Sequence, residues 1–330
     1  MRFAIVGCGL IGQKRLRSLK VPDQVTVTCD PVLERAQALA NQAKGATAMT
    51  DWRAAVARPD VDAVFVATSN DALAAVTLAA VEAGKHVVVE KPAARNPGEL
   101  VPVIAAAEKN GVCVQVGFNH RYHPALQKAR ELFDSGALGP MMYIRARYGH
   151  GGRVGYDKEW RAKPEISGGG ELLDQGVHLI DLSRWFLGDF PHVSGHVGTF
   201  FWDMPAEDNG FLLLKTATGQ VAWLHATWTE WKNTFSFEIF GKDAKLHIEG
   251  LGGSYGTEKL SYYKMKPEMG PPETTIWEYP GEDHSWRLEL EDFKKAIAEK
   301  RPAPVGLHDA HAALTIVYEI YRQAGTTPKT

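Results

Sequence analysis

The first twelve residues restrict the fold more than any other part of the chain. A short apolar run, Phe3–Val6, leads into the sequence G-C-G-L-I-G at residues 7–12, and helical periodicity follows. In a G-x-G-x-x-G turn the first glycine permits the tight turn, the second lets backbone approach a pyrophosphate, and the third lets helix pack against strand. The segment therefore predicts a strand–turn–helix unit that binds a dinucleotide through Gly7, Gly9, Leu10, Ile11 and Gly12.

An acidic residue follows the second expected strand. The segment V-T-V-T-C at residues 25–29 precedes Asp30, which lies 18 residues beyond Gly12. A carboxylate at this place accepts hydrogen bonds from the adenosine ribose and repels a 2′-phosphate. Asp30 therefore favours NAD over NADP, and Arg35, one turn into the next helix, could soften that preference.

Strands and helices alternate through the rest of the first third of the chain. Continuous apolar runs indicate buried strands at 62–68, 85–92 and 113–119, and helices are expected at 72–83 and 97–110. Strands that are apolar on both sides are typical of a parallel sheet covered by helices on both faces. We therefore expect an α/β protein with an N-terminal Rossmann fold, a doubly wound parallel sheet.

Polar residues follow the carboxyl ends of four of these strands. Because ligands of open α/β sheets bind at that edge, these residues are candidates for a cofactor site. They are Asp30, Thr68, Ser69, Asn70, Glu90, Lys91 and Asn119.

The pattern changes after about residue 120. Helices are expected at 124–135, 285–299 and 308–323, and strands at 141–151, 193–202, 210–218, 220–231, 235–241, 245–250, 259–265 and 274–279. Short turns such as Thr218-Gly219 suit antiparallel hairpins. We expect a Rossmann domain at 1–120 and a C-terminal α+β domain at 121–330 with a large, open, mainly antiparallel sheet. Aromatic residues on its outer face favour either an oligomer surface, in a homodimer or homotetramer, or a role in the core alone.

One segment of the second domain combines apolar and charged residues. In Gly168–Phe186, the residues Asp174, His178 and Asp181 stand at i, i+4 and i+7, and therefore share one face of a helix that is otherwise apolar. Buried charge is costly unless it is paired or used. A structural Asp–His pair and a catalytic pair both fit this pattern, and Asp181 is interpreted as structural.

Composition excludes several classes of function. A formal net charge of −2 gives no electrostatic basis for nucleic-acid binding. No apolar run is long enough to cross a bilayer, and the N-terminus does not have the pattern of a signal peptide. Three cysteines without CxxC spacing indicate reduced thiols and a cytoplasmic protein. His120 and His123 have i, i+3 spacing but no accompanying ligand set, so no metal site is expected.

Five short motifs in one order carry a family resemblance. They are GCGLIG at 7–12, EKP at 90–92, GFNHRYHP at 117–124, WR at 160–161 and GGGELLDQGVHLIDL at 168–182. Together they resemble the glucose–fructose oxidoreductase / inositol dehydrogenase / rhizopine-catabolism (Gfo/Idh/MocA) family, over essentially the whole chain. The resemblance implies a Rossmann domain followed by an open-sheet domain, and oxidation or reduction of a carbinol or carbonyl on sugars, cyclitols or sugar nucleotides.

The resemblance also assigns roles to individual residues. It implies that Lys91, Asp174 and His178 form the catalytic set and also contact the substrate. Asn119 and Arg121 match positions that line the cofactor and substrate cleft. Trp160 and Arg161 match a pair near the nicotinamide end of the cofactor.

These residues suit hydride transfer to NAD from a secondary alcohol. His178 would act as general base, because the pKa of an imidazole, about 6.5, is close to the working pH. Lys91 would stabilise the developing alkoxide. Asp174 would either orient the imidazole or bind a neighbouring substrate hydroxyl.

Two other functions remain open at this stage. One is a non-catalytic metabolite sensor that binds NAD, against which the presence of all three catalytic residues counts. The other is an NAD-dependent glycoside hydrolase, which would cleave glycosidic bonds without net formation of NADH.

Overall fold

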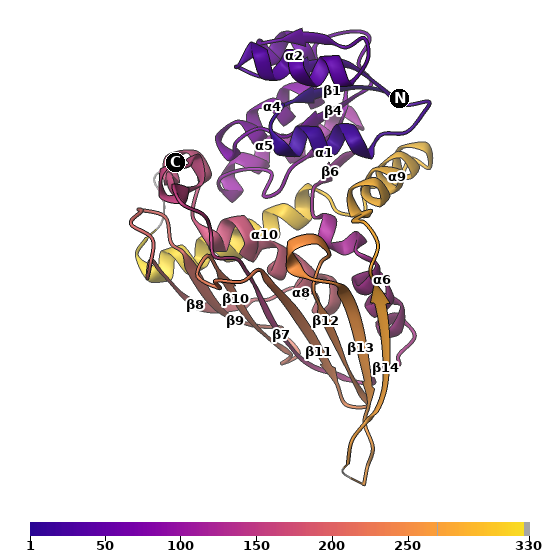
Figure 1. The fold of residues 1–330 in the computed structure, drawn as a ribbon, viewed down its shortest axis with the longest axis vertical. Coiled ribbons are helices and arrows are strands. Elements are labelled where there is room, and N and C mark those ends of the chain that lie inside the picture. Colours follow the sequence, from indigo (N-terminus) through magenta and orange to yellow (C-terminus); the bar gives the residue numbers. More distant parts are fainter. Residues whose placement is uncertain (269, 327–330) are drawn as a thin grey trace.

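The computed structural model describes residues 1–268 and 270–326 of the chain. Two sheets lie one above the other, the first from the N-terminal part of the chain and the second from the C-terminal part (Figure 1). The first has the order β3-β2-β1-β4-β5-β6 and all its strand pairs are parallel. Its strands are β1 (Arg2–Val6), β2 (Gln24–Cys29), β3 (Thr47–Met49), β4 (Ala63–Val66), β5 (His86–Val89) and β6 (Val114–Val116).

Helices connect these strands, mostly as the periodicity predicts. They are α1 (Leu10–Ser18), α2 (Leu33–Gln42), α3 (Trp52–Val56), α4 (Asn70–Glu82) and α5 (Pro97–Asn110). All four residues of β4 are buried, as in a strand covered on both faces. The predicted doubly wound parallel sheet is confirmed. Strand β3 and helix α3 are too short to have shown a period in the sequence.

The second sheet has eight strands in the order β14-β13-β12-β11-β7-β10-β9-β8. They are β7 (Met141–Gly149), β8 (His192–Gly198), β9 (Asn209–Lys215), β10 (Val221–Thr227), β11 (Thr234–Gly241), β12 (Ala244–Glu249), β13 (Glu258–Lys264) and β14 (Glu273–Tyr279). Only β7 and β10 pair in parallel. The prediction of a mainly antiparallel sheet is therefore confirmed.

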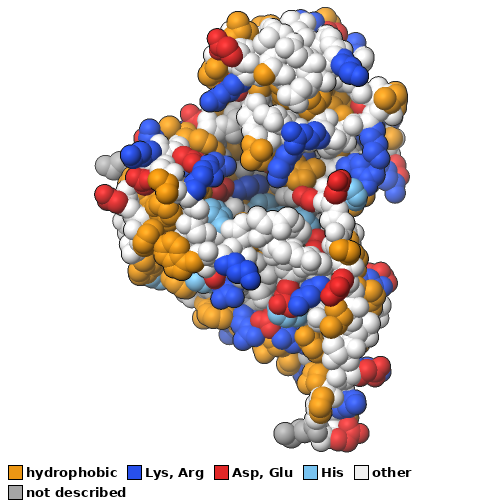
Figure 2. Space-filling model, in the orientation of Figure 1, with side chains coloured by type: hydrophobic (Ala, Val, Ile, Leu, Met, Phe, Trp, Pro, Cys, Tyr) orange, Lys and Arg blue, Asp and Glu red, His pale blue; other side chains and the backbone are white. Residues whose placement is uncertain are grey.

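Helices separate the two sheets. In Figure 1, α8 (Val177–Leu187) and α10 (Leu307–Ala324) cover the inner face of the second sheet, α6 (Pro124–Asp134) lies beside β13 and β14, and α9 (Ser285–Ala298) lies higher, next to α1. A hollow lies between the upper and lower parts of the molecule, with Lys, Arg and His side chains around it (Figure 2).

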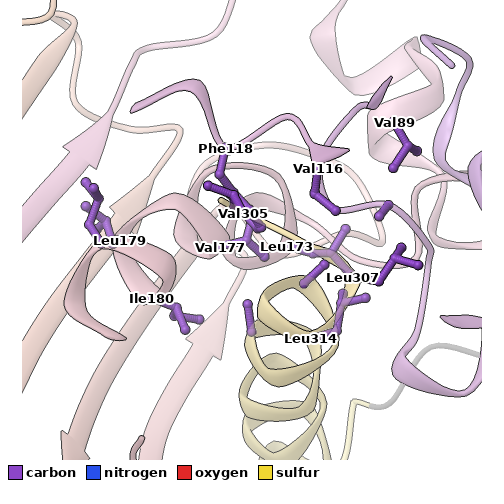
Figure 3. Packing of buried hydrophobic residues seen from close by; sticks show 14 of the residues in the cluster. Val89, Val116, Phe118, Leu173, Val177, Leu179, Ile180, Val305, Leu307 and Leu314 are labelled. Atoms are coloured by element: carbon purple, nitrogen blue, oxygen red, sulfur yellow. The ribbon is translucent and has the colours of Figure 1, made fainter. Parts of the chain in front are cut away.

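One apolar cluster extends from the first sheet to the second. Figure 3 shows Val89, Val116 and Phe118 near residues of α8 and α10, such as Val177 and Leu314. All five side chains are buried, with at most 1% exposure. Because both parts share this core, the division at 1–120 and 121–330 stays a prediction.

The tryptophans of β10 and the segment after it divide as the alternation indicates. Trp223 is 51% and Trp231 is 67% exposed, whereas Trp228 is fully buried.

Within the residues that the structure describes, no helix is both long and apolar enough to cross a membrane.

Candidate active site

The glycine turn after β1 has the backbone that a pyrophosphate requires. Gly7 has φ +96°, and a Cβ there would lie 2.3 Å from the carbonyl oxygen of Ala67. A Cβ on Gly12 would lie 2.1 Å from the carbonyl oxygen of Gly7, so helix and turn can pack only with glycine. A Cβ on Gly9 would meet no heavy atom within 4 Å. The space beside Gly9 at the start of α1 is open to a ligand, and the turn therefore fits a dinucleotide.

The other residues predicted in this turn, Leu10 and Ile11, begin α1, and Leu10 is 68% exposed.

Asp30 is fixed at the end of β2. Its Oδ2 accepts a hydrogen bond from the amide of Cys8 at 2.9 Å, and its Oδ1 accepts one from the amide of Val32 at 3.0 Å. The carboxylate is thereby held beside the glycine turn, whereas Arg35 is an exposed residue of α2.

Side chains at the other strand ends differ in their contacts. Thr68 and Ser69, after β4, are partly exposed. Asn70 and Asn119 are buried, and each donates a hydrogen bond to the C-terminal part of the chain. The amide of Asn70 reaches the carbonyl oxygen of Ser167 at 2.8 Å, and that of Asn119 reaches Oγ of Ser285 at 2.9 Å. These two residues link the edge of the first sheet to the C-terminal part of the chain.

Glu90 takes part in a buried ion cluster. Arg15 of α1 is 1% exposed, and its Nε donates to Oε1 of Glu90 at 2.7 Å. Another nitrogen of Arg15 contacts the carboxylate of Glu289 in α9. The carboxylate of Glu90, predicted to contact a cofactor, is directed to Arg15 instead. Because Arg15 and Glu289 are 274 residues apart, no local sequence signal indicates this cluster.

Lys91 reaches from the edge of the first sheet to Asp174 in the C-terminal part of the chain. Its Nζ lies 2.5 Å from Oδ1 of Asp174 and 2.5 Å from the carbonyl oxygen of the same residue. The sequence allows a cis bond before Pro92, and the peptide bond between Lys91 and Pro92 is cis in the structure. The predicted meeting of Lys91 and Asp174 is present in the structure.

The segment that carries Asp174 is not a regular α-helix. Residues Leu172–Gly176 form a π-helical turn, η4, and α8 follows directly with His178 as its second residue. Glu207 holds the start of this segment, because its carboxylate accepts hydrogen bonds from the amides of Gly170 at 2.8 Å and Leu172 at 3.2 Å. The expectation of one regular helix over Gly168–Phe186 was wrong at its N-terminal end.

Two cations surround the carboxylate of Asp174. Besides Lys91, Nε of Arg161 lies 3.2 Å from Oδ2 of Asp174. Burial raises the pKa of Asp174, but Lys91 and Arg161 outweigh it, so the pKa lies well below its usual range and the group stays ionised. Trp160, the neighbour of Arg161, lies under its guanidinium at 4.5 Å.

The imidazole of His178 packs against other aromatic rings. It is 4% exposed, and its imidazole stacks on that of His120 with centroids 3.8 Å apart and planes at 16°. Burial first, and then Lys91 and His123, lower the pKa of His178 well below its usual value, so the ring is neutral at neutral pH. Nδ1 is buried without a hydrogen-bond partner. Asp174 therefore does not orient this imidazole, which corrects one of the two roles expected for it.

The guanidinium of Arg121 is paired with carboxylates in the interior of the protein. Its guanidinium donates to both carboxylate oxygens of Asp181, at 2.8 and 2.6 Å, and also contacts Asp309 at 3.2 Å. Arg121 is 7% and Asp181 is 1% exposed. The interpretation of Asp181 as structural is confirmed. The expected contact of Arg121 with a substrate does not agree with this buried pair, which uses the guanidinium inside the protein.

Two buried groups near the site were not predicted from the sequence to be site residues. Both carboxylate oxygens of Glu171 are buried and have no hydrogen-bond partner among the residues that the structure describes, and burial raises the pKa of Glu171 well above its usual value. His120 is the other. Its neighbour His123 contacts Oε2 of Glu258 at 2.8 Å.

The described ranges, 1–268 and 270–326, contain no group of three or more His, Cys, Asp or Glu side chains that could hold a metal ion.

Family models match most of the chain. A model described as the oxidoreductase family, NAD-binding Rossmann fold, matches residues 1–118. A model of the GFO/IDH/MocA C-terminal domain matches residues 126–247.

Individual proteins are also similar. The chain is 31% identical to D-glucoside 3-dehydrogenase of Escherichia coli, over 99% of this chain and 96% of that protein. It is 33% identical to levoglucosan dehydrogenase of Pseudarthrobacter phenanthrenivorans, over 52% of this chain and 44% of that protein. For this relative and two inositol 2-dehydrogenases, the chain spans only 44–65% of the relative's length.

A solved structure of levoglucosan dehydrogenase in complex with NADH and levoglucosan has the same fold. The TM-score is 0.88 at 24% identity, and the superposition covers 99% of this chain and 97% of that one.

Proposed function

The chain belongs to the Gfo/Idh/MocA oxidoreductase family, and on this premise we propose that it is an NAD-dependent dehydrogenase of a secondary alcohol on a sugar or cyclitol. The observation that carries the proposal is the contact of Lys91 with Asp174 beside His178. A lysine at the edge of the NAD-binding sheet there contacts Asp174, and its charge also acts on the imidazole of His178. The dehydrogenase activities named for the relatives support the choice of substrate class.

NAD would be held by the turn of Gly7, Gly9 and Gly12 and by the carboxylate of Asp30. The open space beside Gly9 supports this fit, and so does the fixed position of Asp30 beside the amide of Cys8. Asp30 would repel the 2′-phosphate of NADP. The bound nicotinamide ring supplies the hydride acceptor for oxidation of the alcohol.

Each side chain of the site would have a distinct task. His178 is neutral at neutral pH, so its imidazole can accept the proton of the substrate hydroxyl, and can return it in the reverse reaction. The ammonium group of Lys91 would donate a hydrogen bond to the reacting oxygen and stabilise negative charge on it. Asp174 and Arg161 would fix the position of Lys91 through the ion cluster that they form with it.

We propose the finer features of the protein on the same basis. Residues 1–120 would form the NAD-binding domain, and residues 121–330 the domain for substrate binding and oligomerisation. The outer face of the second sheet, with Leu213 and Trp223 about half exposed, supports a homodimer or homotetramer. Three free cysteines support a cytoplasmic location.

A substrate panel tests the proposed function. The protein is incubated with NAD, and in parallel with NADP, and with aldoses, glycosides, levoglucosan and inositols, while absorbance of the reduced nicotinamide is followed. We expect a sustained increase with at least one polyol and a preference for NAD. Thermal stabilisation by NAD and the polyol without any reduction would indicate a sensor. Release of free sugar from a glycoside without net NADH would indicate a hydrolase.

A further inference from the structure

The imidazole of His178 has aromatic rings on several sides. His120 covers its face, and Phe118 meets it edge-on, with centroids 5.7 Å apart and planes at 84°. Tyr148 of β7 lies 6.2 Å away at 71°. Nδ1 of His178 is buried and has no hydrogen-bond partner within residues 1–268 and 270–326, so the orientation of this ring depends on contacts with other rings.

His120 is itself fixed. It lies in η1 (Asn119–Tyr122), the short 3-10 helix after β6, and both of its neighbours in the chain are anchored. Asn119 donates to Ser285, and Arg121 is paired with Asp181. The ring of His120 is 5% exposed and packs edge-on against Tyr148, with centroids 5.1 Å apart. A ring held in this way is a rigid surface for its partner to stack on.

We propose that His120 is a positioning residue, which orients the imidazole of His178 by ring stacking rather than through a hydrogen bond. This inference rests on the proposed function, which makes His178 the general base. A base must lie within hydrogen-bond reach of the proton that it removes, so a small tilt of its ring is costly. His120 touches neither substrate nor cofactor in this role, and its effect passes through His178.

Burial, and then the charged surroundings, keep both rings neutral. Lys91 after β5 and His123 after η1 act on His178, and His178, His123, Lys91 and Lys14 of α1 act on His120. The carboxylates of Glu258 and Asp283 lie near His123, at 2.8 and 3.9 Å. Burial is the largest cause of the low pKa of each stacked ring. Removal of the cover over His178 should therefore raise its pKa.

Two substitutions distinguish the role of the aromatic face of His120 from that of its nitrogen atoms. His120→Phe keeps an aromatic face, whereas His120→Leu removes it. For His120→Leu we expect kcat to decrease by about 10²-fold, the order of loss for a misplaced catalytic group, with an unchanged dissociation constant for NAD. His120→Phe should restore most of this loss. His225→Leu is the control, because His225 also stacks on a ring, that of Phe211 at 4.2 Å, but on the outer side of the second sheet.

A second readout does not need a substrate. In protein labelled with ¹³C-histidine, the titration of His178 is followed by NMR, with its signal assigned from a His178→Asn variant. We expect titration well below pH 6.5 in the wild type and in His120→Phe, and a shift toward about 6.5 in His120→Leu. If the wild type reduces no NAD with any substrate, the proposed function fails, and this titration still decides whether His120 controls His178.

Three outcomes would overturn the proposal. In the first, His120→Leu matches the wild type in kcat and in the His178 titration. In the second, His120→Phe is as impaired as His120→Leu, which means that His120 acts through its nitrogen atoms. In the third, both variants lose NAD binding and melting temperature together, which assigns His120 to folding alone. Retention of NAD binding in His120→Phe with a normal melting temperature separates this last outcome from the others.

Discussion

Nζ of Lys91 lies 2.5 Å from Oδ1 of Asp174, although the two residues are 83 positions apart in the sequence and lie next to different sheets. Lys91 follows the end of β5, and Asp174 belongs to the π-helical turn before α8. Their contact therefore depends on how the C-terminal part of the chain packs against the first sheet. It also leaves the imidazole of His178 without a carboxylate partner, since Asp174 is engaged with Lys91 and Arg161.

Neutralisation of Asp174 should reduce turnover more than cofactor binding. In Asp174→Asn, Lys91 and Arg161 lose the charge that holds them, and we expect kcat to decrease by about 10²-fold because the catalytic groups are displaced. The dissociation constant for NAD, measured by fluorescence titration, should change by less than about threefold. Asp189→Asn is the control, because Asp189 is paired with Arg184 but its side chain is 82% exposed. Equal losses of turnover and NAD affinity would contradict the assigned role.

Loss of the imidazole of His178 should remove general-base catalysis. For His178→Asn we expect kcat to decrease by about 10²- to 10⁴-fold, the usual range for this kind of assistance. In the wild type, the pKa of His178 is lowered by burial and by Lys91, so activity should decrease only as the pH falls well below 6.5. The measurement is kcat/KM from pH 5 to 9. An acidic limb centred above pH 7 would assign the base to another group.

Asp30 should control the choice of cofactor. Asp30→Ala removes the acceptor for the ribose hydroxyls, and we expect NAD to bind about 10- to 100-fold more weakly, as for loss of a hydrogen bond to a charged group. The discrimination against NADP should decrease at the same time. Glu34→Gln, an exposed carboxylate in the first turn of α2, serves as control. Unchanged binding of both cofactors in Asp30→Ala would exclude the role.

Glu289 should make stability depend on pH. It shares one guanidinium, that of Arg15, with Glu90, and burial and the charge of Glu90 raise the pKa of Glu289 to about 7. The folded state then binds more protons than the unfolded state between pH 4.5 and 7, so the free energy of unfolding should decrease as the pH rises through this range.

The change is on the order of 2–3 kcal/mol if Glu289 titrates alone. Glu289→Gln should remove most of this decrease, as measured by urea unfolding at pH 5 and pH 8. Glu291→Gln on the same helix should leave it unchanged, because Glu291 is 54% exposed. A difference between pH 5 and 8 that is the same in wild type and Glu289→Gln would exclude this source of pH dependence.

Sequence reasoning predicted the architecture well because the architecture depends on local patterns. The apolar runs of β4 and β5 and the glycines at 7, 9 and 12 specify a parallel sheet with a dinucleotide turn, whichever residues follow. The positions of Lys91 and Asp174 could also be anticipated, from the order of short motifs.

The partners of the site residues could not be predicted in this way. Arg121 pairs with Asp181 and Asp309, which are 60 and 188 residues away, and no local period relates them. The same holds for the stacking of His120 on His178, which depends on the position of η1 over α8. The π-helical turn could not be predicted either, because the sequence pattern of this segment is that of an ordinary helix. Glu207, which anchors the turn, comes from a loop that is distant in the sequence.

The outer face of the second sheet should hold the subunits together. Trp223 of β10 pairs with Leu213 of β9, and these two side chains are 51% and 49% exposed. An apolar surface of this kind in the middle of a sheet is typical of an interface. Trp223→Glu would place a charge in that interface, and burial of an unpaired charge is costly, so we expect dissociation toward monomers. Light scattering after size exclusion measures the mass. Val154→Glu, which makes the same kind of change at a fully exposed residue outside the strands of the sheet, should leave the mass unchanged. A wild-type protein that is monomeric at micromolar concentration would exclude the interface.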